Sequence, residues 1–235
     1  MKSVVVLQSN YIPWKGYFDL VHDAELFIFY DDLQYTKNDW RNRNKIKAGN
    51  GAEWMSIPVG ADSNRLICEV EIPDKTWQIK HWKTLQYNYS SSPYFRLYRA
   101  FFEDFYLGEK WGNLSMLNQH LIRRIAVDFL GISTVFEDSR QYNLSGQKQD
   151  RLLELLRKAQ ATRYISGPAA KDYIEPERFV EAGIDLVWKD YSGYPEYPQR
   201  FRPFEHGVSI LDLLFNVGAD APWYIWGWRD GSLSS

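Results

Sequence analysis

Short apolar runs separated by amphipathic segments dominate the chain and predict an α/β fold. The runs at residues 4–7 and 26–30 are too short for helices and are rich in Val, Ile and Phe, which is typical of buried strands. Apolar residues spaced three and four apart instead predict helices, as at residues 114–130 between Asn113 and Gly131. Further predicted strands are residues 54–59, 66–72, 134–137, 163–166 and 185–188. Further predicted helices are residues 17–23, 92–105, 148–159 and 210–216, together with a helix from about residue 77 and a short helix between Pro176 and Gly183.

The alternation of these elements favours an open, mostly parallel sheet of the Rossmann-like, nucleotidyltransferase-like kind. The chain has 235 residues, of which 45% are hydrophobic, so it can bury the core of one large domain. We therefore expect a single α/β domain over residues 1–235. Within it we expect an aromatic-rich helical insert at about residues 77–110 and an aromatic C-terminal loop and tail at about residues 190–235.

Polar and aromatic segments follow the first two predicted strands directly, at residues 8–17 and 31–44. The carboxyl ends of parallel strands meet at one edge of a sheet, where ligands of this architecture bind. These segments therefore predict a binding site. The substrate-binding residues expected in them are Gln8, Asn10, Tyr11, Trp14, Lys15, Gly16, Tyr17, Gln34, Tyr35, Lys37, Trp40, Arg41, Asn42 and Arg43.

Three side chains in the sequence could carry a proton during a reaction. Asp31 and Asp32 end the second predicted strand, and His81 stands beside Lys and Trp in the helical insert. The competing interpretations are a capping aspartate and a hydrogen-bonded structural histidine. Backbone N–H groups at Ser166 and Gly167, directly after a predicted strand, could hold an anion or form a plain turn. Further expected binding residues are Ser166, Gly167, Lys171, Tyr197 and Gln199.

The charge balance argues against non-specific binding to nucleic acid or to a membrane surface, because 28 Lys and Arg against 30 Asp and Glu give a formal net charge of -2. The local basic cluster at residues 37–47 suits a compact anion such as phosphate. Cys68 is the single cysteine and the four histidines are scattered, so neither a disulfide nor a metal site is expected. The sequence identifies no cofactor.

No apolar run approaches the roughly 20 residues of a membrane span, and the first run is too short for a secretory signal. We therefore expect a cytoplasmic protein without a membrane span. Three tryptophans within residues 223–228 predict that the tail docks on the body or on a partner, for example a second copy in a homodimer.

Four segments together resemble the WbqC-like family: residues 8–18, residues 31–35 with 40–44, residues 166–173 and residues 212–216. The resemblance covers essentially the whole chain. One departure is Ser9, where the family usually has Pro after Gln, which removes a conformational restraint but no functional group. The resemblance implies a role in making or modifying a precursor of O-antigen or a related bacterial surface polysaccharide, without specifying the reaction.

Two functions follow from these observations. The first is a transferase acting on a nucleotide-linked sugar or small-metabolite precursor, for example by acyl or aminoacyl transfer, with a phosphate-bearing substrate held by Lys37, Arg41 and Arg43. The second is a non-catalytic binding or assembly protein of the same pathway, whose exposed aromatics dock a partner. Polar groups of distinct chemistry at neighbouring strand ends favour the transferase, because such groups are costly to gather unless a ligand uses them.

Overall fold

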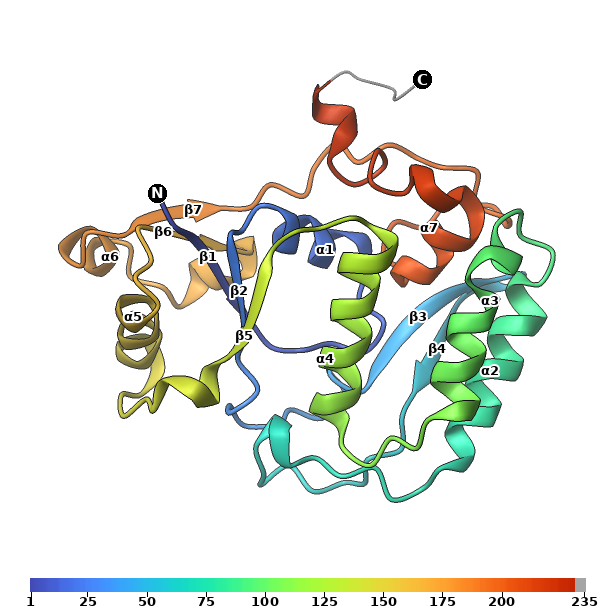
Figure 1. The fold of residues 1–235 in the computed structure, drawn as a ribbon, viewed down its shortest axis with the longest axis horizontal. Helices are drawn as coiled ribbons and strands as arrows, with labels where there is room; N and C mark the ends of the chain where they lie inside the picture. Colours follow the sequence, from blue (N-terminus) through green and yellow to red (C-terminus); the bar gives the residue numbers. More distant parts are fainter. Residues whose placement is uncertain (231–235) are drawn as a thin grey trace.

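The computed structural model describes residues 1–230 and contains a five-stranded parallel sheet, which confirms the predicted α/β class (Figure 1). The strand order is β5-β2-β1-β6-β7, so β1 is the central strand. Val4 of β1 lies opposite Leu26 on one side and Tyr164 on the other. The strands are β1 (Ser3–Leu7), β2 (Leu26–Phe29), β5 (Val135–Asp138), β6 (Arg163–Ser166) and β7 (Asp185–Trp188).

The strand order places a topological switch point beside β1. The chain builds outward from β1 to β2 and β5, and then returns past β1 to build β6 and β7 on the other side. The connections that leave the carboxyl ends of β1 and β6 therefore diverge to opposite faces of the sheet. In open α/β sheets, the crevice between two such connections is where ligands bind.

Helices cover both faces of the sheet. Alternation along β1 sends Val5 into one core, and Val4 and Val6 into the core on the other face. Helices α1 (Lys15–His22), α4 (Leu114–Arg124) and α7 (Ile210–Val217) contribute to the Val5 core, whereas α5 (Lys148–Lys158) and α6 (Glu177–Glu181) contribute to the other. Among residues 1–230, none of the helices is both long and apolar enough to cross a membrane.

A helical pair and a hairpin extend the Val5 side of the molecule (Figure 1). The pair consists of α2 (Thr76–Tyr89) and α3 (Phe95–Glu103), which continues in a π-helical turn at Asp104–Gly108. The hairpin consists of antiparallel β3 (Arg43–Ala48) and β4 (Gly51–Ser56). The helices predicted from residue 77 and over residues 92–105 are therefore confirmed.

Two parts of the sequence prediction differ from the structure. The edge strand predicted at residues 66–72 is wrong, because this segment contains a 3₁₀ turn at Ile67–Glu69. The Glu69 carboxylate accepts a hydrogen bond from the backbone N–H of Leu66 at 2.8 Å, which favours the turn over an extended chain. Strand β3 has no counterpart in the prediction, because its sequence is mostly polar and it pairs only with β4.

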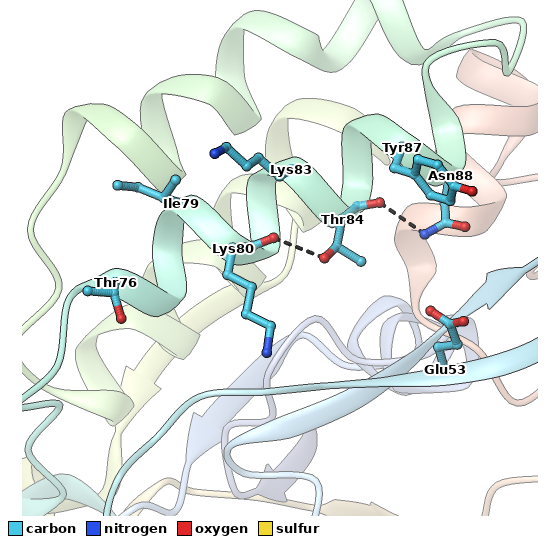
Figure 2. A pocket seen from close by; sticks show the side chains of 8 residues that line it. All are labelled: Glu53, Thr76, Ile79, Lys80, Lys83, Thr84, Tyr87 and Asn88. Carbon is cyan, nitrogen blue, oxygen red and sulfur yellow. Dashed lines mark hydrogen bonds between the residues drawn. The ribbon is translucent and has the colours of Figure 1, made fainter.

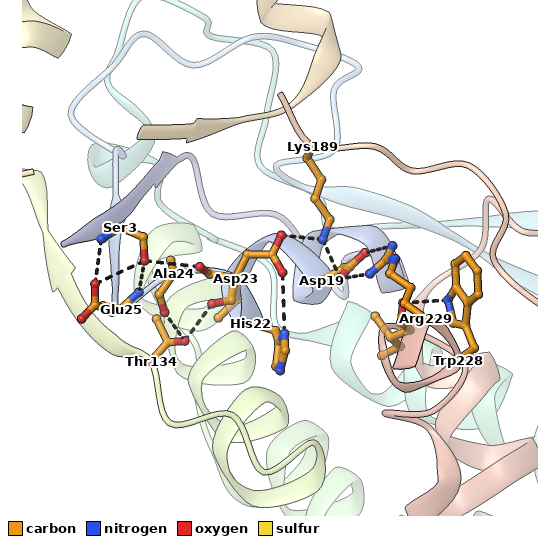
Figure 3. Close-up of polar contacts among 12 residues, drawn as sticks. Ser3, Asp19, His22, Asp23, Ala24, Glu25, Thr134, Lys189, Trp228 and Arg229 are labelled. Carbon is orange, nitrogen blue, oxygen red and sulfur yellow. Dashed lines mark hydrogen bonds and ion pairs between the residues drawn. The ribbon is translucent and has the colours of Figure 1, made fainter. Parts of the chain in front are cut away.

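The described part of the C-terminal tail lies on the body of the protein. Figure 3 shows the buried Asp19 of α1 between Lys189, which follows β7, and Arg229 near the end of the described chain. The Trp226 ring stacks on His22 with centroids 4.0 Å apart. These contacts attach the tail to α1. Residues 231–235 of the predicted tail lie outside the described residues.

Candidate functional site

A cleft of about 920 Å³ opens at the switch point of the sheet. Gln8 after β1, and Ser166 with Gly167 at the end of β6, lie at its base. The segment that follows β6 contributes Tyr173, and the first turn of α5 contributes Lys148. Three residues expected to bind substrate, Gln8, Ser166 and Gly167, are thus brought together although about 160 positions separate them in the chain.

The first turn of α5 lies at an end of the cleft that carries side chains of both charge signs, because Lys148 and Arg178 line it together with Asp150 and Glu175. Backbone N–H groups at a helix N-terminus attract anions, and Lys148 adds a full charge beside them. The Gln149 side-chain amide donates a hydrogen bond to the Glu175 carbonyl and accepts one from the Glu175 backbone N–H, both 3.0 Å long. Arg178 also lines the cleft and forms an ion pair with Asp150. Because Arg178 is paired with Asp150, Lys148 and the backbone N–H groups are the donors that this end of the cleft offers to a phosphate or another compact anion.

Arg41 lies in a polar corner next to the cleft. Its guanidinium donates a hydrogen bond to the Asn10 side chain and lies 3.4 Å from Asp39, and its Nε has no hydrogen-bond partner among the described residues. The side-chain amide of Asn118 donates to the Arg41 carbonyl at 2.8 Å, which fixes the backbone at this position. Asn10 and Arg41 thus meet, as the sequence predicts for groups that follow neighbouring strands.

Tyr17 connects the Arg41 corner to the cleft. Its hydroxyl donates to the carbonyl of Gln8, a cleft residue, at 3.1 Å. Burial raises the pKa of Tyr17, the Asp31 carboxylate raises it further, and the Arg41 charge acts in the opposite direction. Burial also raises the pKa of Tyr173, and the Arg41 charge offsets part of that increase. The Arg41 guanidinium therefore acts on both Tyr17 and Tyr173.

Trp14 packs against Gly16 at the start of α1 and is not among the residues that line the cleft. Its indole ring folds back over Gly16, where an added Cβ would lie 2.3 Å from the ring. Glycine is therefore required at this position for the ring to lie as it does. The edge of Trp14 meets Tyr191 with centroids 5.2 Å apart, and the Tyr191 hydroxyl lies 3.5 Å from where a Cβ of Gly167 would be. The Trp14 and Tyr191 rings thus form a row from the start of α1 to Gly167, which lines the cleft.

Asp31 is committed to bonds within the protein. It is fully buried and accepts hydrogen bonds from the backbone N–H of Ser9 at 2.8 Å, from the Gln119 amide at 3.0 Å and from the Ser115 hydroxyl. These bonds tie the loop after β1 to the end of β2 and to α4. The position of Asp31 explains how the chain holds the polar loop in place, while its predicted catalytic role stays a prediction.

Asp32 has a more accessible carboxylate than Asp31. It accepts a hydrogen bond from the Ser139 hydroxyl and forms an ion pair with Arg151 of α5. Arg151 belongs to the helix whose first turn lines the cleft, so Asp32 is linked to the cleft wall. Its predicted catalytic role also remains untested.

His81 lies in a buried cluster of aromatic residues. Its Nδ1 is 2.8 Å from the Tyr11 hydroxyl, which is in turn 2.6 Å from the Tyr106 hydroxyl. Burial lowers the pKa of His81 to about 4, so its ring is neutral at pH 7. Neither His81 nor Tyr11 lines the cleft, and their expected roles in the site stay predictions.

Lys15, Tyr197 and Gln199 gather on the side of α1 that faces the late loop. The Lys15 ammonium lies 4.8 Å from the Tyr194 ring centre and 5.4 Å from that of Tyr197, and burial lowers its pKa to about 8. The Tyr197 hydroxyl and the Gln199 amide both donate to Asp212 of α7 at 2.6 Å. Burial raises the pKa of Asp212, although these bonds favour its charged form.

Comparison with known proteins gives the family of the chain. The model of the WbqC-like protein family matches residues 8–224, which include the Arg41 corner, all cleft-lining residues except Val6 and Leu7, and every strand of the sheet except β1. The chain belongs to the WbqC-like protein family. It is 46% identical over 227 residues to "Uncharacterized protein Rv1507c" of Mycobacterium tuberculosis (strain ATCC 25618 / H37Rv), covering 96% of this chain and 98% of that protein. No solved structure matches the chain.

Other residues predicted for the site of this WbqC-like protein lie around its margins. Gln34 donates to the Ser63 carbonyl at 3.4 Å, and the Asn42 amide donates to the Ile57 carbonyl at 2.9 Å. Both therefore hold loops together. Tyr35 lies beneath the Arg65 guanidinium, Lys37 is exposed, and Lys171 lies over the Trp188 ring. Trp40 and Arg43 lie at the hairpin.

The structure adds cleft residues that the sequence reasoning does not select. Lys148, Gln149, Tyr173 and Arg178 line the cleft although no catalytic motif contains them. The one feature of the sequence that pointed to these residues is the predicted start of a helix at residue 148, since a helix N-terminus can bind an anion. Assigning it to the site requires the order of the strands, because only that order brings α5 next to β1.

Two other hollows lie away from the carboxyl edge of the sheet. Figure 2 shows a groove of about 540 Å³ along the outer side of α2, where Lys80 and Tyr87 stand across from Glu53 of β4. A smaller hollow of about 470 Å³ lies between His22 and Thr134, at the opposite edge of the sheet. Within residues 1–230, no cluster of three or more His, Cys, Asp and Glu side chains is arranged to hold a metal ion.

Proposed function

We propose that this WbqC-like protein is a transferase that binds a phosphate-bearing precursor, such as a nucleotide-linked sugar, in the switch-point cleft. The observation that carries the proposal is the cleft itself, about 920 Å³ in volume, at the edge of the sheet where α/β proteins bind ligands. We place the reaction in the biosynthesis of O-antigen or a related surface polysaccharide, the role that the family resemblance implies.

The phosphate is expected at the α5 end of the cleft. Backbone N–H groups of the first helical turn and the Lys148 ammonium supply donors there. Arg41 would supply a further charge from the corner next to Tyr17, through a guanidinium that donates to Asn10 and lies 3.4 Å from Asp39. Arg41 is not among the residues that line the cleft, so it would act on the substrate through its charge, while Lys148 would make the direct contact.

The group to be transferred is expected near Gln8, Tyr173 and Ser166, where polar side chains and rings meet. Acyl or aminoacyl transfer to a sugar amine needs a group that accepts a proton from the attacking amine. Asp32 fits that role best among the predicted candidates, because Asp31 and His81 are more completely buried. Arg151 would hold the Asp32 carboxylate in its orientation through their ion pair.

A thermal-shift series with nucleotides and nucleotide-linked sugars tests the proposal. A ligand present at about one hundred times its Kd stabilises the folded state by about 2.7 kcal/mol, which for a chain of this size raises Tm by roughly 5–10 °C. Lys148→Ala and Arg41→Ala are expected to reduce or abolish the shift, each measured against its own ligand-free Tm. Lys80→Ala, in the groove of Figure 2, is the matched control and should leave the shift unchanged.

The absence of a shift across the whole series would contradict the proposal, and so would an equal loss in Lys80→Ala. The alternative function, a non-catalytic assembly protein, relies on exposed tail tryptophans as a docking surface. The structure weakens that alternative, because Trp226 stacks on His22 of the same chain and the Trp228 N–H donates to the Ile225 carbonyl at 3.3 Å.

A further inference from the structure

Two tryptophans lie side by side on the surface of the β3–β4 hairpin. Trp40 precedes β3 and is 43% exposed, and Trp54 of β4 is 46% exposed. Their ring centroids are 5.4 Å apart and their planes are tilted by 36°. Adjacent half-exposed indoles cost free energy in contact with water, so such a pair marks a binding surface. We call Trp40, Trp54, Arg43 and Lys45 the tryptophan platform.

Two cations lie over the Trp54 ring. The Arg43 guanidinium carbon lies 4.3 Å from the ring centre, and Asn38 accepts hydrogen bonds from this guanidinium, which hold it there. Lys45 lies directly opposite Trp54 in the hairpin, with its ammonium 5.1 Å from the ring centre. Among residues 1–230, no carboxylate is within ion-pair distance of Lys45. The Lys45 ammonium therefore keeps its donors available for a ligand.

We propose that the tryptophan platform binds a pyranose ring that carries a carboxylate. One face of a pyranose presents polarised C–H groups, which the exposed Trp40 ring and the exposed part of the Trp54 ring attract. The carboxylate would accept charge-assisted hydrogen bonds from the Lys45 ammonium. This site is separate from the cleft, and the inference does not depend on what occupies the cleft.

The open shape of the platform favours a sugar over a nucleobase. A base gains most when parallel rings cover both of its faces, whereas these two indoles are tilted by 36° and do not form two parallel walls. A sugar bound to an open surface keeps its remaining hydroxyl groups in water and avoids the cost of burying them. The positive charge of Arg43 and Lys45 selects an acidic sugar over a neutral one.

The platform also lies next to the Arg41 corner. Trp40 immediately precedes Arg41, and its carbonyl accepts a hydrogen bond from the backbone N–H of Tyr11 at 3.0 Å. This bond joins the base of the platform to the loop after β1. A sugar on the platform would therefore sit beside the loop that leads from β1 into the cleft.

Ligand-observed saturation-transfer NMR with D-glucuronate tests the inference. D-Glucose is the matched neutral sugar, and AMP is the probe that combines an anion with a base. We expect signal transfer to the sugar C–H protons of glucuronate, an affinity for glucose that is at least about tenfold weaker, and no competition by AMP. Equal binding of glucose and glucuronate, or displacement of glucuronate by AMP, would overturn the proposal.

Three variants locate the bound sugar. Trp54→Ala and Lys45→Gln should each weaken glucuronate binding by at least about tenfold, because one removes the ring and the other the charge. Tyr87→Ala is the matched control, since this aromatic residue is 85% exposed on α2 and should leave binding unchanged. Wild-type affinity in Trp54→Ala would overturn the proposal. The Tm shift by nucleotide-linked sugars, measured in the same variant, reports on the cleft separately.

Discussion

Replacing Asp19 by Asn is expected to loosen the attachment of the C-terminal tail. Asp19 is fully buried in α1 and receives two hydrogen bonds from Arg229, at 2.9 and 2.8 Å, one from Lys189 at 2.7 Å and one from the Tyr194 hydroxyl (Figure 3). Asn keeps the shape of the side chain but removes its charge. The substitution leaves Lys189 with Asp23 as its remaining carboxylate partner, 2.6 Å away.

The size of the effect follows from burial. Breaking a buried ion pair from one side typically costs 3–5 kcal/mol, and we expect the lower end, about 3 kcal/mol, because the Arg229 side chain is 30% exposed and can be rehydrated. For a chain of this size that corresponds to a fall in Tm of roughly 6–12 °C.

Urea denaturation of wild type and Asp19→Asn measures the change in the free energy of unfolding. Asp185→Asn is the matched control, because its ion pair with Arg163 is on the surface and is worth less than about 1 kcal/mol. A loss below about 1 kcal/mol in Asp19→Asn, equal to the control, would refute the conclusion that this carboxylate anchors the tail.

Three further predictions concern residues around α1 and α2. Gly16→Ala should destabilise the protein by about 1–3 kcal/mol, because the added Cβ displaces the Trp14 ring; denaturation and near-ultraviolet circular dichroism would detect this, and an unchanged aromatic spectrum would contradict it. The folded-state pKa of His81 is about 4, below its unfolded value near 6.5, so its contribution to stability is present above pH 6.5 and is lost as the pH falls towards 4. His81→Gln should flatten the pH dependence of Tm in that window, and an unchanged slope would argue against a buried neutral ring. Lys15→Met should raise Tm at pH 7, because burial disfavours the ammonium and lowers its pKa to about 8; a lower Tm would show that its contacts with aromatic rings outweigh desolvation.

Continuous apolar runs made most of the sheet predictable from sequence. The strands expected at residues 163–166 and 185–188 coincide with β6 and β7, because each is a short, largely apolar run between turn signals. Alternation misled at residues 66–72, where the buried Ile67, Val70 and Ile72 pack on the core. This segment forms isolated bridges, Leu66 with Gln34 and Glu71 with Asn113, in place of a strand. The polar β3 offers no signal of this kind, since it forms a hairpin only through its pairing with β4.

The candidate site was predictable in part. Groups that leave β1 and β2 do meet, as Asn10 and Arg41 show, because those strands are neighbours in the sheet. The cleft itself lies between β1 and β6, and residue patterns do not reveal that these strands are adjacent. For the same reason Lys148 could not be assigned to the site before the strand order was known.

Hydrogen–deuterium exchange with and without a nucleotide-linked sugar that raises Tm tests the central claim most directly. If the switch-point cleft is the substrate site, the ligand will slow the exchange of backbone amides in the first turn of α5, near Lys148, and in the segment after β6, near Gly167. Exchange that slows along the outer face of α2 instead, with those two segments unchanged, would contradict the claim.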